Sequence, residues 1–97
     1  MKIIHSKNFQ LALNELLEFI AQRDGVNRAL NFRDELLIEI DKIYPMPKKH
    51  RKNSVLNDES VRDLIFKGYV VPFQIHADRI EILSIYKSNL CKPKSII

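Results

Sequence analysis

The groups with the greatest capacity for chemistry in this sequence are cationic, and they are densest in one short stretch. Residues 47–52 read PKKHRK, which places Lys48, Lys49, Arg51 and Lys52 around His50. Closely spaced Lys and Arg side chains can bind the phosphates of a nucleic acid or the acidic side chains of a protein. A run of charges can equally be a solvated loop, and the sequence leaves both interpretations open.

The histidines and serines give no sign of a metal site or a nucleophilic site. His5, His50 and His76 are separated by 45 and 26 residues, and no Cys or carboxylate lies at ligand spacing from them. Like charge around His50 disfavours its protonation, which would suit a general base, although a plain exposed histidine fits as well. The sequence has no nucleophile elbow and no phosphate-binding glycine loop. We therefore expect neither a metal nor a cofactor.

The charge of the chain is unevenly distributed over its 97 residues. Residues 1–47 carry six Lys/Arg and seven Asp/Glu, whereas residues 48–97 carry ten and five, so the net charge of +4 arises in the second half. Such an excess suits a nucleic acid, the ribosome or an acidic protein partner, and it also suits simple solubility. A length of 97 residues with 45% hydrophobic residues predicts a single domain, residues 1–97.

The expected location of the protein is the cytoplasm. Cys91 is the only cysteine, so the chain cannot form an internal disulfide, and this favours a reducing compartment. The N-terminus has no long apolar segment of the kind found in signal peptides. No apolar run approaches the ~20 residues of a membrane span, so we expect no membrane association.

The first half of the chain is predicted to form two amphipathic helices, which help to position the basic groups of the second half. A short strand at residues 2–5 precedes Ser6, a candidate N-cap, and an apolar stripe from Phe9 to Ile20 predicts a helix that ends near Gly25. Asn27 is the candidate cap of a second helix, whose stripe extends to Tyr44 before Pro45 and Pro47. The short connection predicts an antiparallel helical hairpin.

Three strand-like runs follow a polar loop at residues 48–60. They are residues 61–67, 69–76 and 79–87, with turns at Lys67-Gly68 and at Ala77-Asp78. Pro72 has no N–H, so we expect its strand to be at an edge, bulged, or unpaired at that amide. The order β-α-α-β-β-β predicts an α+β fold in which a helical hairpin covers one face of a mainly antiparallel sheet.

This order of elements resembles the RelE/ParE superfamily of bacterial toxins. The similar segments are residues 8–20 and 28–44 and the stretch VRDLIFKGYVVPFQIHADRIEILSIYKSNL, with its Gly68-Tyr69 step and its ILSIYK last strand. The resemblance implies a basic, cytoplasmic toxin of a type II toxin–antitoxin pair, which a cognate antitoxin neutralises. RelE-like members cut messenger RNA on the ribosome, whereas ParE-like members poison DNA gyrase and are not nucleases.

The chain departs from the ribonuclease pattern at the residue after the Gly-Tyr step. RelE-like ribonucleases usually carry an Arg there, and this chain has Val70; Val61 and Asp63 also stand where such members tend to hold Lys. We therefore lean towards a ParE-like toxin that inhibits gyrase. The alternatives are a RelE-like messenger ribonuclease and an inactive protein-interaction module.

The resemblance also directs attention to particular side chains. If the protein is a ribonuclease, the candidate catalytic residues are Tyr86, Lys87 and Arg62, although Tyr86 and Lys87 also fit a strand end with no such role. Candidates for binding RNA or a protein target are Lys48, Lys49, His50, Arg51, Lys52, Lys67 and Arg79. Apolar Leu90, Ile96 and Ile97 near the C-terminus suggest a segment that an antitoxin shelters.

Overall fold

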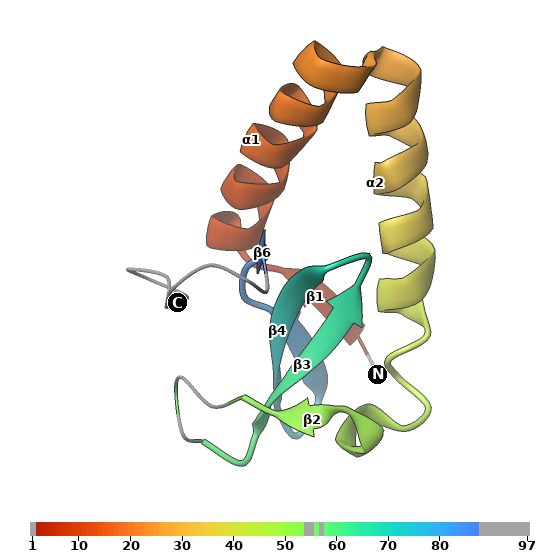
Figure 1. The fold of residues 1–97 in the computed structure, drawn as a ribbon. Helices are drawn as coiled ribbons and strands as arrows, with labels where there is room; N and C mark the ends of the chain where they lie inside the picture. The colour runs from red at the N-terminus through yellow and green to blue at the C-terminus, as the bar shows by residue number, and fades with distance from the viewer. Residues whose placement is uncertain (1, 54–55, 57, 88–97) are drawn as a thin grey trace.

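The computed structural model describes residues 2–53, 56 and 58–87, in an α+β arrangement (Figure 1). In chain order the elements are β1 (Lys2–His5), α1 (Lys7–Asp24), α2 (Val26–Asp41), the 3-10 helix η1 (Pro47–Lys49), β2 (Arg51–Lys52), β3 (Val61–Phe66), β4 (Tyr69–Ile75), β5 (Arg79–Ile82) and β6 (Tyr86–Lys87). The strands of the described part form one sheet in the order β1-β5-β4-β3-β2, and β6 pairs with β4. β1 runs parallel to β5 while the other pairs are antiparallel, so the predicted fold class is confirmed.

The helical hairpin is held by local signals at its ends. The Ser6 hydroxyl accepts a hydrogen bond of 3.0 Å from the Phe9 amide, which confirms the predicted cap of α1. Gly25 alone joins the helices at a φ of 100°, a conformation that favours glycine. The prediction for Asn27 was wrong, because α2 begins at Val26 and no side chain caps it. α2 also ends at Asp41, before Tyr44.

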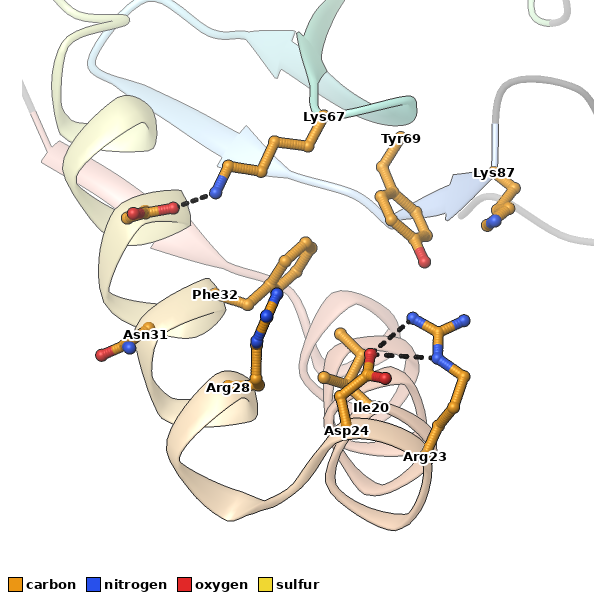
Figure 2. A pocket seen from close by; sticks show the side chains of 10 residues that line it. Ile20, Arg23, Asp24, Arg28, Asn31, Phe32, Lys67, Tyr69 and Lys87 are labelled. Carbon is orange, nitrogen blue, oxygen red and sulfur yellow. Dashed lines mark hydrogen bonds and ion pairs between the residues drawn. The ribbon is translucent and has the colours of Figure 1, made fainter.

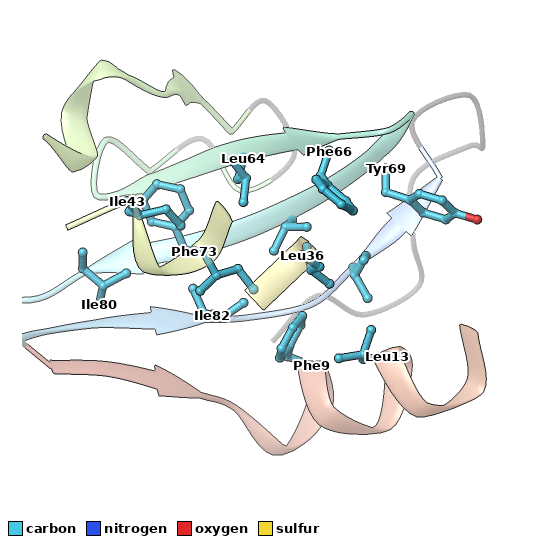
Figure 3. Close-up of a cluster of buried hydrophobic side chains, with 13 residues drawn as sticks. Phe9, Leu13, Leu36, Ile43, Leu64, Phe66, Tyr69, Phe73, Ile80 and Ile82 are labelled. Carbon is cyan, nitrogen blue, oxygen red and sulfur yellow. The ribbon is translucent and has the colours of Figure 1, made fainter. Parts of the chain in front are cut away.

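Both helices pack their apolar stripes against one face of the sheet (Figure 3). Phe9 and Leu13 of α1 meet Leu36 of α2 and Phe73 of β4 in a single buried cluster. The helices diverge from their connecting turn towards the sheet, so the sheet lies across the open end of the hairpin (Figure 1). Burial of this face is the main force that fixes the helices on the strands.

Pro72 lies inside the sheet and not at its edge, and the neighbouring strand is broken beside it. β5 ends at Ile82 and β6 begins at Tyr86, so the last strand is split and does not run from residue 79 to residue 87 as the sequence suggested. Leu83 donates its N–H to the Pro72 carbonyl at 2.8 Å, but Pro72 has no N–H to return. The Leu83 carbonyl instead accepts from Ser6 Oγ and Asn8 Nδ2, at 3.1 and 3.2 Å.

The turn between β3 and β4 is the two-residue turn that the sequence predicts. Lys67 and Gly68 both have positive φ values, 48° and 83°, and they connect the paired residues Phe66 and Tyr69. Two residues of positive φ match the right-handed twist of the flanking strands in hairpins of this length. The turn places the Lys67 side chain where its ammonium pairs with Glu35 of α2. None of the described helices is long and apolar enough to cross a membrane.

Candidate functional site

Two neighbouring residues of β3 hold the basic loop against the sheet. Arg62 donates hydrogen bonds from its guanidinium to the carbonyls of Glu59, Lys48 and His50, at 3.1, 3.3 and 3.2 Å. β2 pairs with β3 through Lys52 opposite Arg62 and Arg51 opposite Asp63. Arg62, a candidate catalytic residue from the sequence, therefore serves as a clamp on the backbone of the loop.

Asp63 anchors the same loop from the opposite face of the sheet. Its side chain is only 4% exposed and accepts hydrogen bonds from Asn53 Nδ2 at 2.7 Å and Arg51 Nε at 3.2 Å. Asn53 in turn accepts from the Leu56 amide at 2.9 Å. Burial, followed by the charge of Asp63, raises the pKa of Tyr86, so its hydroxyl stays protonated near neutral pH. Tyr86, a candidate catalytic residue from the sequence, thus lies near the buried carboxylate of Asp63.

His50 is turned inward towards the core. Its ring meets the Phe73 ring edge to face, with centroids 5.4 Å apart, and its Nε2 is buried and has no hydrogen-bond partner in the described part of the chain. Burial, followed by the charge of Lys49, lowers the pKa of His50. The sequence predicted the effect of the like charge, but the larger cause is the burial, which only the structure reveals.

Much of the cationic charge in the loop is already paired. Arg51 is bound to Asp63, and the Lys52 ammonium lies 2.9 Å from a carboxylate oxygen of Glu59. Lys48 and Lys49 are exposed and have no ion-pair partner among the described residues. The loop therefore offers two lysines to an external anion, fewer than its sequence suggests.

The three candidate catalytic residues do not converge. Arg62 pairs with Phe73 and Lys87 pairs with Tyr69, so they lie four residues apart along β4, or about 13 Å at ~3.3 Å per residue. Tyr86 packs against the buried Val61 and Leu83, whereas the Lys87 ammonium lies 5.7 Å from the centre of the Tyr69 ring. Val70, at the position of the expected Arg, is 2% exposed. These three residues therefore do not place an acid, a base and a phosphate-binding cation at one point.

A second group of cations converges at the opposite end of the sheet, where it forms a cavity that we call the hairpin pocket (Figure 2). The cavity has a volume of about 480 Å³ and lies between the turn of the helical hairpin and the β3–β4 turn. Its lining combines cationic, acidic and aromatic side chains: Ile20, Arg23, Asp24, Arg28, Asn31, Phe32, Glu35, Lys67, Tyr69 and Lys87.

Two of the four cations in the hairpin pocket form ion pairs with acidic residues that also line it. Arg23 is bound to Asp24 at 2.9 Å, and Lys67 is bound to Glu35. Arg28 has no ion-pair partner in the described part of the chain, and neither has Lys87, whose ammonium lies 5.7 Å from the centre of the Tyr69 ring. Phe32 packs edge to face on Tyr69 and gives the pocket an apolar wall.

Sequence reasoning found only part of this pocket. Lys67 was a candidate binding residue and Lys87 a candidate catalytic residue, whereas Arg23 and Arg28 were not among the candidates. The available signal was RDGVNR at residues 23–28, because a helical hairpin brings the two ends of its turn together. Arg79 is elsewhere: it lies at the start of β5, bound to Asp78 at 2.9 Å. The described residues contain no cluster of His, Cys, Asp and Glu that could hold a metal ion.

Leu90, Ile96 and Ile97 lie outside the described residues.

Comparison with known proteins identifies the family. Residues 3–89 match the model of the ParE toxin of the type II toxin–antitoxin system parDE. A solved structure titled "Chromosomal ParDE TA system from P. aeruginosa" is similar, with a TM-score of 0.76 and 16% sequence identity over 90% of this chain and 95% of that chain. No curated protein sequence matches. Because the family model covers most of the sequence, this chain belongs to the ParE toxin family of type II toxin–antitoxin systems.

Proposed function

We propose that this protein inhibits bacterial growth by acting on DNA gyrase, without cutting RNA, and that a cognate antitoxin neutralises it in the cytoplasm. Membership of the ParE family supports the role of toxin. Gyrase is the target that the ParE-like mode implies. One observation favours gyrase inhibition over messenger cleavage. Val70 is apolar and buried, and it stands at the position where RelE-like ribonucleases usually carry an Arg.

The placement of the remaining polar groups supports the same choice. Cleavage of RNA without a metal requires a group that takes the proton of the 2′-hydroxyl and a cation that stabilises the phosphate, both within hydrogen-bond distance of the reacting atoms. Arg62 is instead bonded to three carbonyls of its own chain. The Tyr86 side chain packs against Val61 and Leu83, whereas the Lys87 ammonium lies near the Tyr69 ring.

Two assays on the purified protein test this proposal. In the first, the protein is mixed with DNA gyrase, ATP and supercoiled plasmid, and cleaved linear DNA is measured after denaturation of the gyrase. In the second, the 5′ ends of a reporter messenger are mapped after cell-free translation with and without the protein. We expect cleaved plasmid in the first assay and an intact messenger in the second.

New messenger ends at ribosomal A-site codons would overturn the proposal and establish the ribonuclease alternative. The variant R62A/Y86F/K87A is then the control, because a ribonuclease that uses these residues would lose the cleavage. No effect in either assay, together with unimpaired growth of cells that express the protein alone, would instead indicate an inactive interaction module.

A further inference from the structure

A separate cavity lies at the end of the sheet remote from the turn of the helical hairpin, beside η1 and β2 (Figure 1). It has a volume of about 280 Å³, and we call it the loop cavity. Its lining comes from η1, from β3 and the residues before it, and from the end of β4: Lys48, Glu59, Ser60, Arg62, Ile75 and His76. Pockets that enclose a whole small-molecule ligand begin at about 300 Å³, so this cavity suits one compact group.

The hydrogen bonds that clamp the basic loop use only part of the Arg62 guanidinium. Nε donates to the Glu59 carbonyl, and Nη1 donates to the carbonyls of Lys48 and His50. These bonds occupy the N–H of Nε and both N–H groups of Nη1, whereas Nη2 has no acceptor among the described residues. The two N–H groups of Nη2 are therefore available to a ligand, on a guanidinium that the clamp already holds in place.

Lys48 supplies a second cation to the same cavity. Its carbonyl accepts a hydrogen bond of 3.3 Å from Arg62, so the clamp fixes the Lys48 backbone close to the guanidinium. The Lys48 ammonium has no ion-pair partner within the part of the chain that the structure describes. The Glu59 carboxylate also lines the cavity, but it is bound to the Lys52 ammonium at 2.9 Å. The cavity thus offers two cations to an external anion.

The other polar side chains that line the cavity are already engaged. The Ser60 hydroxyl donates to Asp58 Oδ1 at 2.8 Å and accepts from Gln74 Nε2 at 3.2 Å. His76 Nε2 lies 3.3 Å from a carboxylate oxygen of Glu81 on the neighbouring strand. Recognition of a ligand therefore depends on the two cations, which select for negative charge.

We propose that the loop cavity binds a phosphate group through Arg62 Nη2 and the Lys48 ammonium. A carboxylate is bound best by two neighbouring nitrogens of a guanidinium, and here Nε and Nη1 are occupied by backbone carbonyls. A phosphate has oxygens that point in several directions, so it can accept from Nη2 and from an ammonium at the same time. This inference goes beyond the proposed function, because it does not depend on the target of the toxin.

The phosphate group can belong to a nucleic acid backbone or to a free nucleotide. The described residues that line the cavity include no Phe, Tyr or Trp on which a base would stack. The contact is therefore to the phosphate alone, and we expect it to be independent of base sequence.

The test is a titration of the ¹⁵N-labelled protein with inorganic pyrophosphate, followed by NMR at low ionic strength. We expect shifts of the backbone amides of Lys48, Ser60 and Arg62 and of the Arg62 Nε–H group. The variant K48A should bind pyrophosphate at least about threefold more weakly, since it removes one of the two cations. The variant R62K, which keeps the charge but removes the Nη2 donors, should also bind more weakly, and its amide spectrum shows whether the loop stays in place.

The matched control is K49A, which removes the same charge from the next residue of η1, an exposed lysine that does not line the cavity. Its affinity for pyrophosphate should stay within about 1.5-fold. Sodium acetate is titrated in parallel at the same ionic strength. The proposal is overturned if K48A and K49A weaken binding equally, or if acetate moves the same amides as far. It is also overturned if pyrophosphate instead moves the amides of Arg28, Lys67 and Lys87 in the hairpin pocket.

Two further titrations identify the source of the phosphate. Short DNA duplexes of two unrelated sequences, and ATP, are added at several salt concentrations. If both duplexes bind equally and K48A reduces the slope of log affinity against log salt by about 1, the site takes a nucleic acid backbone. If ATP binds more tightly than either duplex and K48A weakens it, the site takes a free nucleotide. If neither ligand moves the amides around the loop cavity, the proposal is wrong.

Discussion

The two ends of the β3–β4 hairpin carry positive charge in different ways. At one end the basic run of residues 47–52 is contiguous in sequence, but Arg51 and Lys52 are paired, and the neighbouring Arg62 holds the backbone of the loop. At the other end four cations from distant parts of the chain meet in the hairpin pocket, where Arg28 and Lys87 have no ion-pair partner among the residues that the structure describes. A high local density of charge in the sequence is therefore a poor guide to the charge that is available for binding.

This contrast has a physical cause. A loop that crosses the edge of a sheet must satisfy its own backbone groups, and nearby Arg and Asp side chains are well suited to do so. The turn of a helical hairpin satisfies its backbone within the helices, as the bond from the Gly25 amide to the Ala21 carbonyl illustrates. Its side chains are then free to face solvent or a ligand.

The largest expected effect is a difference in stability between two variants, each of which loses a carboxylate at one end of the β3–β4 hairpin. Asp63→Ala should lower the free energy of unfolding by about 2 kcal/mol, because it leaves the buried Asn53 amide without its acceptor. Glu35→Ala removes a carboxylate from the exposed ion pair with Lys67 and should cost less than about 1 kcal/mol. Urea unfolding measured by circular dichroism gives both values, and equal losses would contradict the distinction.

The same comparison can be made for the arginines. Arg62→Ala should cost about 1 kcal/mol, since three backbone carbonyls lose their donor, and it should speed tryptic cleavage within residues 48–52. Arg28→Ala, its matched control, should change stability by less than about 0.5 kcal/mol. The two variants are compared by urea unfolding and by timed proteolysis. An unchanged rate of cleavage in R62A would argue against its role as a clamp.

The smallest expected effect is a dependence of stability on pH that His50 confers. Burial lowers the pKa of His50 in the folded protein, so below a pH of about 6.5 the unfolded chain binds more protons. The stabilisation of the folded protein that comes from neutral His50 is therefore complete above that pH. It is lost as the pH falls through the pKa of His50 in the unfolded chain towards its lower pKa in the folded protein. The urea midpoint should fall between pH 7.5 and pH 5.5, and His50→Phe should reduce that fall.

A matched control for this experiment is His5→Phe. The His5 ring also packs edge to face on an aromatic ring, that of Phe9, with centroids 5.2 Å apart. If H5F and H50F reduce the fall in the urea midpoint equally, the effect does not originate at His50.

The sequence by itself determined the local features of this protein. The Ser6 cap, the glycine at the hairpin turn, the two apolar stripes and the Lys67-Gly68 turn all depend on interactions within a few residues, so their patterns are readable. The absence of an Arg after the Gly-Tyr step could also be read directly. The start of α2 was misjudged, because glycine alone provides the connection where Asn27 had been expected to cap.

Only the tertiary structure decided which distant groups meet. The break between β5 and β6 depends on Pro72, which lacks the N–H that would bind the Leu83 carbonyl, and on Ser6 and Asn8, which bind that carbonyl from 77 and 75 residues away. The hairpin pocket likewise joins Arg23 and Arg28 to Lys67 and Lys87. Such contacts follow from strand register and helix packing over the whole chain, and no local pattern in the sequence encodes them.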